Sequence, residues 1–162
     1  PSAKPDQLAD LEQPLALPDS SFDSVLLMNL LEHIFEYRAL LGECARVVKP
    51  GGRIVIVVPY LFPYHASPDD FHRYSASALR RALTAAGYTA VNTVALGTGV
   101  FAARWLFIER LLPRPLAFLS AIMVPCAHGA DWLFSAVARA AGKKYDPADY
   151  ALGFLVTATK KP

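Results

Sequence analysis

The sequence has few charged residues, only two cysteines and no basic tract. Charged residues make up 19% of the 162 residues and the formal net charge is +2, so nothing marks a nucleic-acid-binding surface. Cys44 and Cys126 form neither a disulfide framework nor a metal cluster, so we predict no metal site and a cytoplasmic location. The polar, proline-containing N-terminus shows no signal peptide.

Long uncharged runs are also missing, although 54% of the residues are hydrophobic. The longest run, residues 115–130, has 16 residues and contains Pro125 and Gly129. A helix that crosses a bilayer needs about 20 residues, so the sequence predicts no spanning helix.

Residues 100–147 predict an apolar helical insertion. Two helices are expected, at 100–112 and 116–141, with breaks at 113–115 and again near Pro125 and Gly129. The insertion forms either a buried cap or an amphipathic surface that makes peripheral contact with a membrane. We favour the cap, because scattered apolar residues most often belong to a core.

The segment from Pro18 to Pro59 has the pattern of a strand, a helix and a second strand. Residues 22–28 and 54–58 are short apolar runs, and apolar residues three or four apart between 36 and 48 indicate a helix that ends at the Pro-Gly-Gly of residues 50–52. Two parallel strands joined through a helix predict a right-handed crossover and an α/β fold. Ligands of such sheets bind beyond the carboxyl ends of the strands.

The rest of the chain supplies the flanking elements. An extended piece at 7–11 lies within a loop, a helix capped by Ser75 or Ser77 ends at Gly87, and strands are expected at 89–96 and 151–159. The predicted organisation is a core of residues 1–99 and 148–162, interrupted by the helical insertion 100–147.

Three stretches of the sequence carry a family resemblance. PLALPDSSFDSVLLMNLLEHI, VVKPGGRIVIVVP and a helix ending in AAGY resemble the class I S-adenosylmethionine-dependent methyltransferases, in their broad type 11-like group. The resemblance covers residues 8–97 and, less firmly, the last strand. It implies a Rossmann-like sheet of seven strands whose final strand is antiparallel, with S-adenosylmethionine as cofactor.

The chain departs from that family at its beginning. The glycine-rich loop and the acidic strand end that hold the cofactor are missing, so the chain resembles the carboxyl-terminal portion of the domain. The sheet would then be incomplete at the N-terminus, lacking two central strands. The strand at 22–28 would carry an unpaired edge that invites self-association. We therefore expect this chain alone to bind the cofactor poorly and to be inactive.

The resemblance places five residues at the cofactor. Asp10 and Leu11 would contact the adenine, Asn29 and Leu30 would border the methionine part, and His33 belongs to a Glu-His pair that opens the next helix. The polar residues among them have plainer alternatives. Asp10 is a solvated loop carboxylate, Asn29 a turn residue that bonds its own backbone, and Glu32 and His33 structural residues, which we favour for that pair.

The connection at residues 60–75 is rich in titratable side chains, and it follows a strand end where an acceptor would lie. Methyl transfer needs in-line positioning and, for hydroxyl or amine acceptors, a base. We predict that His65 is the base, because the ordinary pKa of histidine is near neutrality, and that Arg73 clamps an anionic acceptor group. Asp70 and Tyr74 complete the predicted catalytic set. The plainer alternative is a turn after Pro68 in which Arg73 pairs with an aspartate.

The connector matches the pattern H-x-x-P-x-D-F-x-R-Y, which resembles methyltransferases of small molecules or glycan pathways. The D/N-P-P-Y signature of nucleic-acid amino methylation is missing. We expect methyl transfer to a small, lipid-linked or glycan-like acceptor. The alternative from another class is a non-catalytic fragment or membrane-peripheral interaction module. A dehydrogenase is disfavoured, because it would need the same missing glycine loop.

Overall fold

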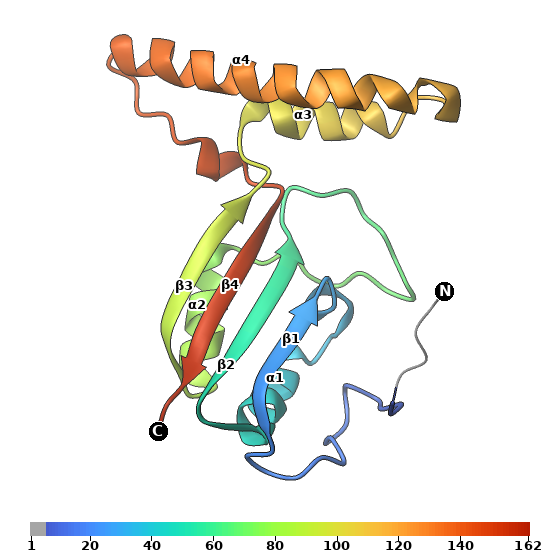
Figure 1. The fold of residues 1–162 in the computed structure, drawn as a ribbon, viewed down its shortest axis with the longest axis vertical. Coiled ribbons are helices and arrows are strands. Elements are labelled where there is room, and N and C mark those ends of the chain that lie inside the picture. The colour runs from blue at the N-terminus through green and yellow to red at the C-terminus, as the bar shows by residue number, and fades with distance from the viewer. Residues whose placement is uncertain (1–5) are drawn as a thin grey trace. The chain divides into compact units, whose positions relative to one another are not determined.

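The computed structural model describes residues 6–162, which form two compact units. Unit 1 comprises the chain up to Val58, His65–Thr93 and Leu155–Pro162, and unit 2 comprises Pro59–Tyr64 and Val94–Phe154. The four strands of the sheet are ordered β1-β2-β4-β3 (Figure 1). Their bounds are Phe22–Met28 for β1, Val48–Pro59 for β2, Tyr88–Leu96 for β3 and Gly153–Lys160 for β4.

The predicted crossover is confirmed. Strands β1 and β2 pair in parallel, with Leu26 opposite Val55, and helix α1 (Tyr37–Val47) connects them. Ile54 and Ile56 on β2 are fully buried, and so is Leu41 on α1. Burial of these branched side chains on both sides of the interface supplies the core of unit 1. The α/β class expected from the sequence is therefore correct.

The helix ends differently from the prediction. Val48, with φ −76° and ψ 137°, is already extended, so β2 begins there instead of at residue 54. Gly51, with φ +75°, lies in an irregular stretch of β2 between two pairings, Phe22 with Val48 and Ser24 with Arg53. A Cβ on Gly52 would lie 2.8 Å from the carbonyl oxygen of Asp23. The Pro-Gly-Gly therefore shapes a strand bulge, not the end of the helix.

Strand β4 runs antiparallel to β3, as the family resemblance implied. The amide of Lys161 donates to the carbonyl of Gly87, and the amide of Leu152 donates to the carbonyl of Leu96. The pairing therefore runs in opposite chain directions, which Figure 1 also shows. Strand β1 lies at one end of the strand order, so among the described residues its only partner is β2. The unpaired edge is thus present, while self-association through it stays a prediction.

Helix α2 (Ala76–Ala85) follows the polar connection. The Oγ atom of Ser75 accepts a hydrogen bond from the amide of Ala78 at 3.3 Å, which identifies Ser75 as the cap in place of Ser77. The cap satisfies one of the unpaired amides at the helix start. Residues 6–21 contain no strand, so the piece at 7–11 is not part of the sheet.

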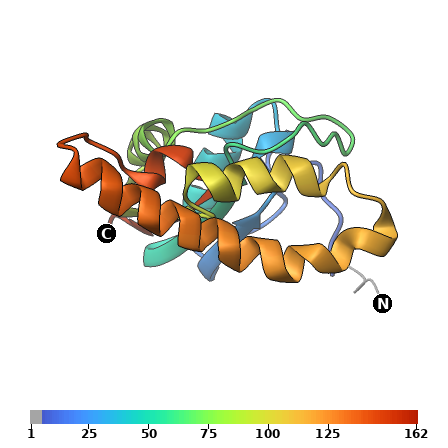
Figure 2. The same ribbon diagram turned by 90° about the horizontal axis from the view of Figure 1, so that it is seen from above.

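Unit 2 contains helices α3 (Val100–Glu109) and α4 (Ser120–Ala140), which lie side by side (Figure 2). Two short 3₁₀ segments, η2 (Arg114–Leu119) and η3 (Pro147–Tyr150), flank α4. The buried carboxylate of Asp131, on α4, accepts hydrogen bonds from the amides of Phe101 and Ala102 at 3.0 and 2.9 Å. This contact explains why the apolar helix α4 carries the charged residue Asp131. A carboxylate satisfies the unpaired amides at the N-terminus of α3 and interacts favourably with the positive end of its helix dipole.

The predicted break near Pro125 and Gly129 is wrong. Residues Arg114–Ala140 form one helical stretch of 27 residues, and among the described residues it is the single helix long and apolar enough, by length and composition alone, to cross a membrane. Only 11% of its most apolar window is buried. Large apolar side chains on it are exposed, including Phe118 at 62% and Trp132 at 71%. The length of the uncharged run underestimated this helix, because the helix continues through Pro125 and past the charged residue Asp131.

Candidate functional site

The carboxyl end of β1 turns sharply into a short 3₁₀ segment. Asn29 has φ +47°, a conformation that asparagine tolerates better than most residues, and its amide donates to the carbonyl of Val57 at 2.9 Å. Segment η1 (Leu31–His33) follows directly. This turn brings Glu32 into the interior, where it is fully buried, and leaves His33 beside it at the surface.

The polar connection is anchored to the main chain of the same segment. The amides of Phe71 and His72 donate to the carbonyl of Glu32 at 2.9 and 3.3 Å. The hydroxyl of Tyr74 donates to the carbonyl of Leu31 at 3.0 Å. These bonds hold residues 65–75 against η1, so the titratable side chains of the two segments become neighbours.

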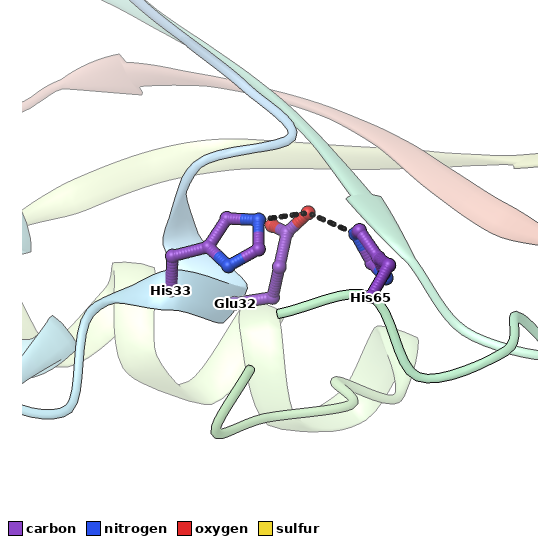
Figure 3. A group of neighbouring side chains, drawn as sticks. All are labelled: Glu32, His33 and His65. Carbon is purple, nitrogen blue, oxygen red and sulfur yellow. Dashed lines mark ion pairs between the residues drawn. The ribbon is translucent and has the colours of Figure 1, made fainter. Parts of the chain in front are cut away.

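Glu32, His33 and His65 form the centre of this arrangement, which we call the Glu-His-His cluster (Figure 3). One carboxylate oxygen of Glu32 lies 3.8 Å from Nε2 of His33 and 3.7 Å from Nε2 of His65. The two imidazole rings are 5.2 Å apart, centroid to centroid, and nearly perpendicular. Neither carboxylate oxygen of Glu32 has a hydrogen-bond partner within the part of the chain that the structure describes.

Asp70 and Arg73 support the cluster from one side. The Arg73 guanidinium binds both oxygens of Asp70, one of them at 2.6 Å. Hydrogen bonding to Arg73 holds the pKa of the Asp70 carboxyl well below its ordinary value, and Asp70 in turn raises the pKa of Arg73. Asp70 also accepts from the amide of His65 at 2.9 Å and lies 3.3 Å from Nδ1 of its ring. The geometry therefore matches the plainer sequence alternative, in which Arg73 pairs with an aspartate.

The predicted catalytic residues thus fall into two groups. His65, Asp70 and Arg73 lie together, with His65 partly open to solvent. Tyr74 is buried, its hydroxyl donates to a backbone carbonyl, and burial raises its pKa, so it is unsuited to proton transfer. Its position indicates that Tyr74 supports η1, while its catalytic role stays a prediction from the sequence.

The predicted cofactor residues are spread over two segments. Asn29, Leu30 and His33 share the turn after β1, and the carbonyl of Leu30 accepts from the amide of His33 at 3.0 Å. Asp10 is exposed and accepts from the amide of Glu12, as a solvated loop carboxylate does, with Leu11 partly buried next to it. That loop is tied to the chain after η1, because Glu12 accepts from the amide of Phe35 at 2.9 Å. Glu12 was missed from the sequence, since nothing local distinguishes it.

Comparison with known proteins shows what part of the chain is similar to. A methyltransferase-domain family matches residues 2–56. A probable S-adenosylmethionine-dependent methyltransferase from Mycolicibacterium smegmatis is 31% identical over 93 residues, which cover 54% of this chain and 35% of that protein. The ubiquinone biosynthesis O-methyltransferase of Bradyrhizobium sp. is 49% identical over 39 residues, which cover 24% of this chain and 15% of the relative. The demethylmenaquinone methyltransferase of Tropheryma whipplei is 43% identical over 42 residues, covering 26% and 18%.

Solved structures share the fold at low identity. The [4+2]-cyclase SpnF is similar with a TM-score of 0.59 and 20% identity, over 96% of this chain and 55% of that one. A methyltransferase of Thermotoga maritima, described as a possible histamine N-methyltransferase, gives a TM-score of 0.56 and 15% identity, over 94% and 62%. The chain spans about a third or less of the three curated relatives named above. The family match and the named relatives make this chain similar in sequence to S-adenosylmethionine-dependent methyltransferases, and the solved structures make it similar in fold.

Proposed function

We propose that the protein carrying this chain transfers a methyl group from S-adenosylmethionine to a small acceptor with an apolar tail, such as a hydroxylated quinol. Two observations support this class of acceptor. Relatives named for ubiquinone and demethylmenaquinone biosynthesis are 49% and 43% identical to short stretches of this chain. Unit 2 presents a long apolar helix with its side chains exposed.

The exposed face of α4 and η2 is the observation that carries the proposal. Its apolar side chains are those of Phe118, Ile122, Trp132, Leu133 and Val137. Basic residues flank it at both ends, with Arg110 and Arg114 before the helix and Arg139, Lys143 and Lys144 at or after its end. An apolar face bordered by cations suits the surface of an anionic membrane. A methyltransferase bound there would meet an acceptor whose tail is held in lipid.

The reaction forms one bond and breaks one. The acceptor oxygen attacks the methyl carbon of the sulfonium in line, the carbon–sulfur bond breaks, and its electron pair stays on sulfur as S-adenosylhomocysteine leaves. The hydroxyl proton must be removed, and the Glu-His-His cluster offers imidazole groups beside the carboxyl end of β1, where ligands of such sheets bind. His65, the more open of the two imidazoles, would act on this proton directly or through a bound cation.

Methyl transfer from labelled S-adenosylmethionine tests the proposal. The chain would be assayed alone and joined to any coding sequence directly upstream of it, with a prenylated hydroxyquinol in vesicles and with an untailed catechol in solution. We expect labelled product with the prenylated acceptor and at least tenfold less with the catechol. Equal rates would contradict an apolar-tailed acceptor, and no product with either acceptor, although the cofactor binds, would contradict the acceptor class.

Vesicle binding tests the role of the exposed helix separately. Phe118→Glu and Trp132→Glu should weaken co-sedimentation with anionic vesicles, whereas Phe22→Glu, at an exposed apolar side chain of unit 1, should leave it unchanged. The second candidate, a non-catalytic membrane-peripheral module, is favoured by the same helix. It would be supported by vesicle binding without any binding of S-adenosylmethionine in calorimetry.

A further inference from the structure

We propose that Glu32, His33 and His65 bind a divalent transition-metal ion, with Zn²⁺ and Co²⁺ as its nearest chemical fits. The sequence predicted no metal site, and the three ligands come from two segments more than thirty residues apart. Each offers one ligand atom, and these atoms all lie within 4.8 Å of one another. The inference is independent of the methyl acceptor, because metal binding is measured without any reaction.

The carboxylate of Glu32 is the first observation. It is fully buried, and neither of its oxygens accepts a hydrogen bond from any described residue. A buried charged group without hydrogen bonds is unfavourable unless a counter-charge is bound to it. Both nearby imidazole nitrogens stand 3.7–3.8 Å away, which is too far for a hydrogen bond. The positive charge of Arg73 interacts with Glu32. The hydrogen-bonding capacity of the two Glu32 carboxylate oxygens is nevertheless left unused among the described residues.

The orientation of His33 is the second observation. Its Nδ1 lies 2.5 Å from the carbonyl oxygen of Asp69, which can only accept, so Nδ1 carries the proton. In a neutral ring Nε2 then presents a lone pair toward the Glu32 carboxylate. Two electron-rich atoms facing each other repel, and a cation between them removes the repulsion. A backbone carbonyl on the far nitrogen is also the usual support of a metal-bound histidine.

His65 has a comparable support. Its Nδ1 lies 3.3 Å from the Asp70 carboxylate and 3.4 Å from the Arg73 guanidinium, which binds both oxygens of that carboxylate and holds it in place. A carboxylate behind one ring nitrogen is the usual support of a histidine that coordinates a metal ion through its other nitrogen, which here is Nε2. The Asp70–Arg73 pair thus has a function in this arrangement that a surface salt bridge would not have, because it orients a ligand.

The spacing fits ligands of one ion better than hydrogen-bonded partners. With metal bonds of about 2.1 Å, two ligands of one ion lie about 3.0 to 4.2 Å apart, depending on the angle between them. Both oxygen–nitrogen separations, at 3.8 and 3.7 Å, fall inside that range. All separations between ligand atoms are at most 4.8 Å. To bring every pair within about 4.2 Å, the imidazoles need to move closer by no more than several tenths of an ångström. His65, whose side chain is 30% exposed, has room for that movement.

The ligand chemistry selects the class of ion. Two imidazoles and one carboxylate suit Zn²⁺, Co²⁺ and similar transition metals, whereas Mg²⁺ prefers oxygen ligands and keeps its water. Three protein ligands leave a coordination position open on the exposed side of His65. A hydroxyl bound there would have its pKa lowered by the metal, which is how a metal ion prepares an oxygen nucleophile at neutral pH.

Metal titration of the chain tests the site. The background would be Cys126→Ser, because the exposed thiol of Cys126 could bind these ions by itself. We expect one equivalent of Zn²⁺ or Co²⁺ by calorimetry and by mass spectrometry of the dialysed protein, with cobalt absorption typical of nitrogen and oxygen ligands. Mg²⁺ should not compete at equal concentration.

Three variants make the assignment specific. His65→Ala and Glu32→Gln should weaken binding by at least roughly tenfold to 100-fold, which is the cost of losing a group that only orients a ligand. His72→Ala, a histidine of the same connection outside the cluster, should leave binding unchanged. Circular dichroism would establish that each variant is folded. If Glu32→Gln does not fold, His65→Ala still tests the site, because the side chain of His65 is partly exposed. Absence of stoichiometric binding, or binding that survives His65→Ala, would overturn the proposal.

Discussion

Substitution of Glu32 by glutamine separates a metal site from a buried ion pair, because the two predict stability changes of opposite sign. In the metal-free protein the carboxylate is fully buried and its oxygens accept no hydrogen bond from a described residue. An unsatisfied buried polar group costs about 1–3 kcal/mol in mutational data, and an unpaired charge costs more. Glu32→Gln should therefore raise the free energy of unfolding without metal, by about 1–3 kcal/mol.

Bound metal should reverse the order of stability of wild type and Glu32→Gln. An ion that binds only the folded state at 100 times its dissociation constant stabilises that state by about 2.7 kcal/mol. Wild type should gain this amount with Zn²⁺, and Glu32→Gln should gain little. The variant would then be more stable than wild type in a chelator and comparable to it or less stable with metal. Glu43→Gln, which removes a carboxylate paired with Arg46 near the surface, should show no such dependence on metal.

The assay must report on unit 1. Both tryptophans, Trp105 and Trp132, lie in unit 2, so their fluorescence follows the other part of the chain. Urea unfolding at pH 8 followed by hydrogen exchange of the β2 amides measures the correct unit. A loss of about 3–5 kcal/mol in the metal-free variant would refute the reasoning, because that is the cost of removing one partner of a buried ion pair. The imidazoles would then be charged and the cluster would need no cation.

Three further predictions follow from the described contacts. Asp131→Ala should lower the free energy of unfolding of unit 2 by about 2 kcal/mol, because two α3 amides lose a charged acceptor. Asp131→Asn should lower it by about half as much. Thermal unfolding followed by tryptophan fluorescence measures both changes. The folded-state pKa of Asp70 is depressed, so its contribution to stability is fully present above about pH 4, the ordinary aspartate range, and is lost as the pH falls below it. Asp70→Asn should therefore lower stability at pH 7 and flatten the decline below about pH 4 in urea titrations. Leu26→Lys, at an exposed position of the edge strand, should reduce any concentration-dependent association in sedimentation, and an unchanged sedimentation profile of a self-associating wild type would exclude that edge.

The sequence by itself determined the strand–helix–strand unit, because that information is local. Apolar runs bounded by turn residues, and a helix whose apolar positions recur every three or four residues, specify β1, α1 and β2 whatever surrounds them. Local patterns also located the polar connection after β2 and narrowed the cap of the next helix to Ser75 or Ser77. They misjudged the end of α1, where pairing of Val48 with Phe22 overrides the proline and glycine signals.

Only the tertiary structure decided what the polar residues do. Glu32 looks like a helix-start carboxylate in the sequence, and its burial follows from the left-handed turn at Asn29 and from two amides of the distant connection that bind its carbonyl. His33 and His65 become neighbours through those same hydrogen bonds. The continuity of α4 through Pro125 depends in the same way on packing against α3, to which Asp131 ties it. Contacts between segments far apart in the chain leave no periodic signal, so the ligand cluster and the long helix could be found only in the folded molecule.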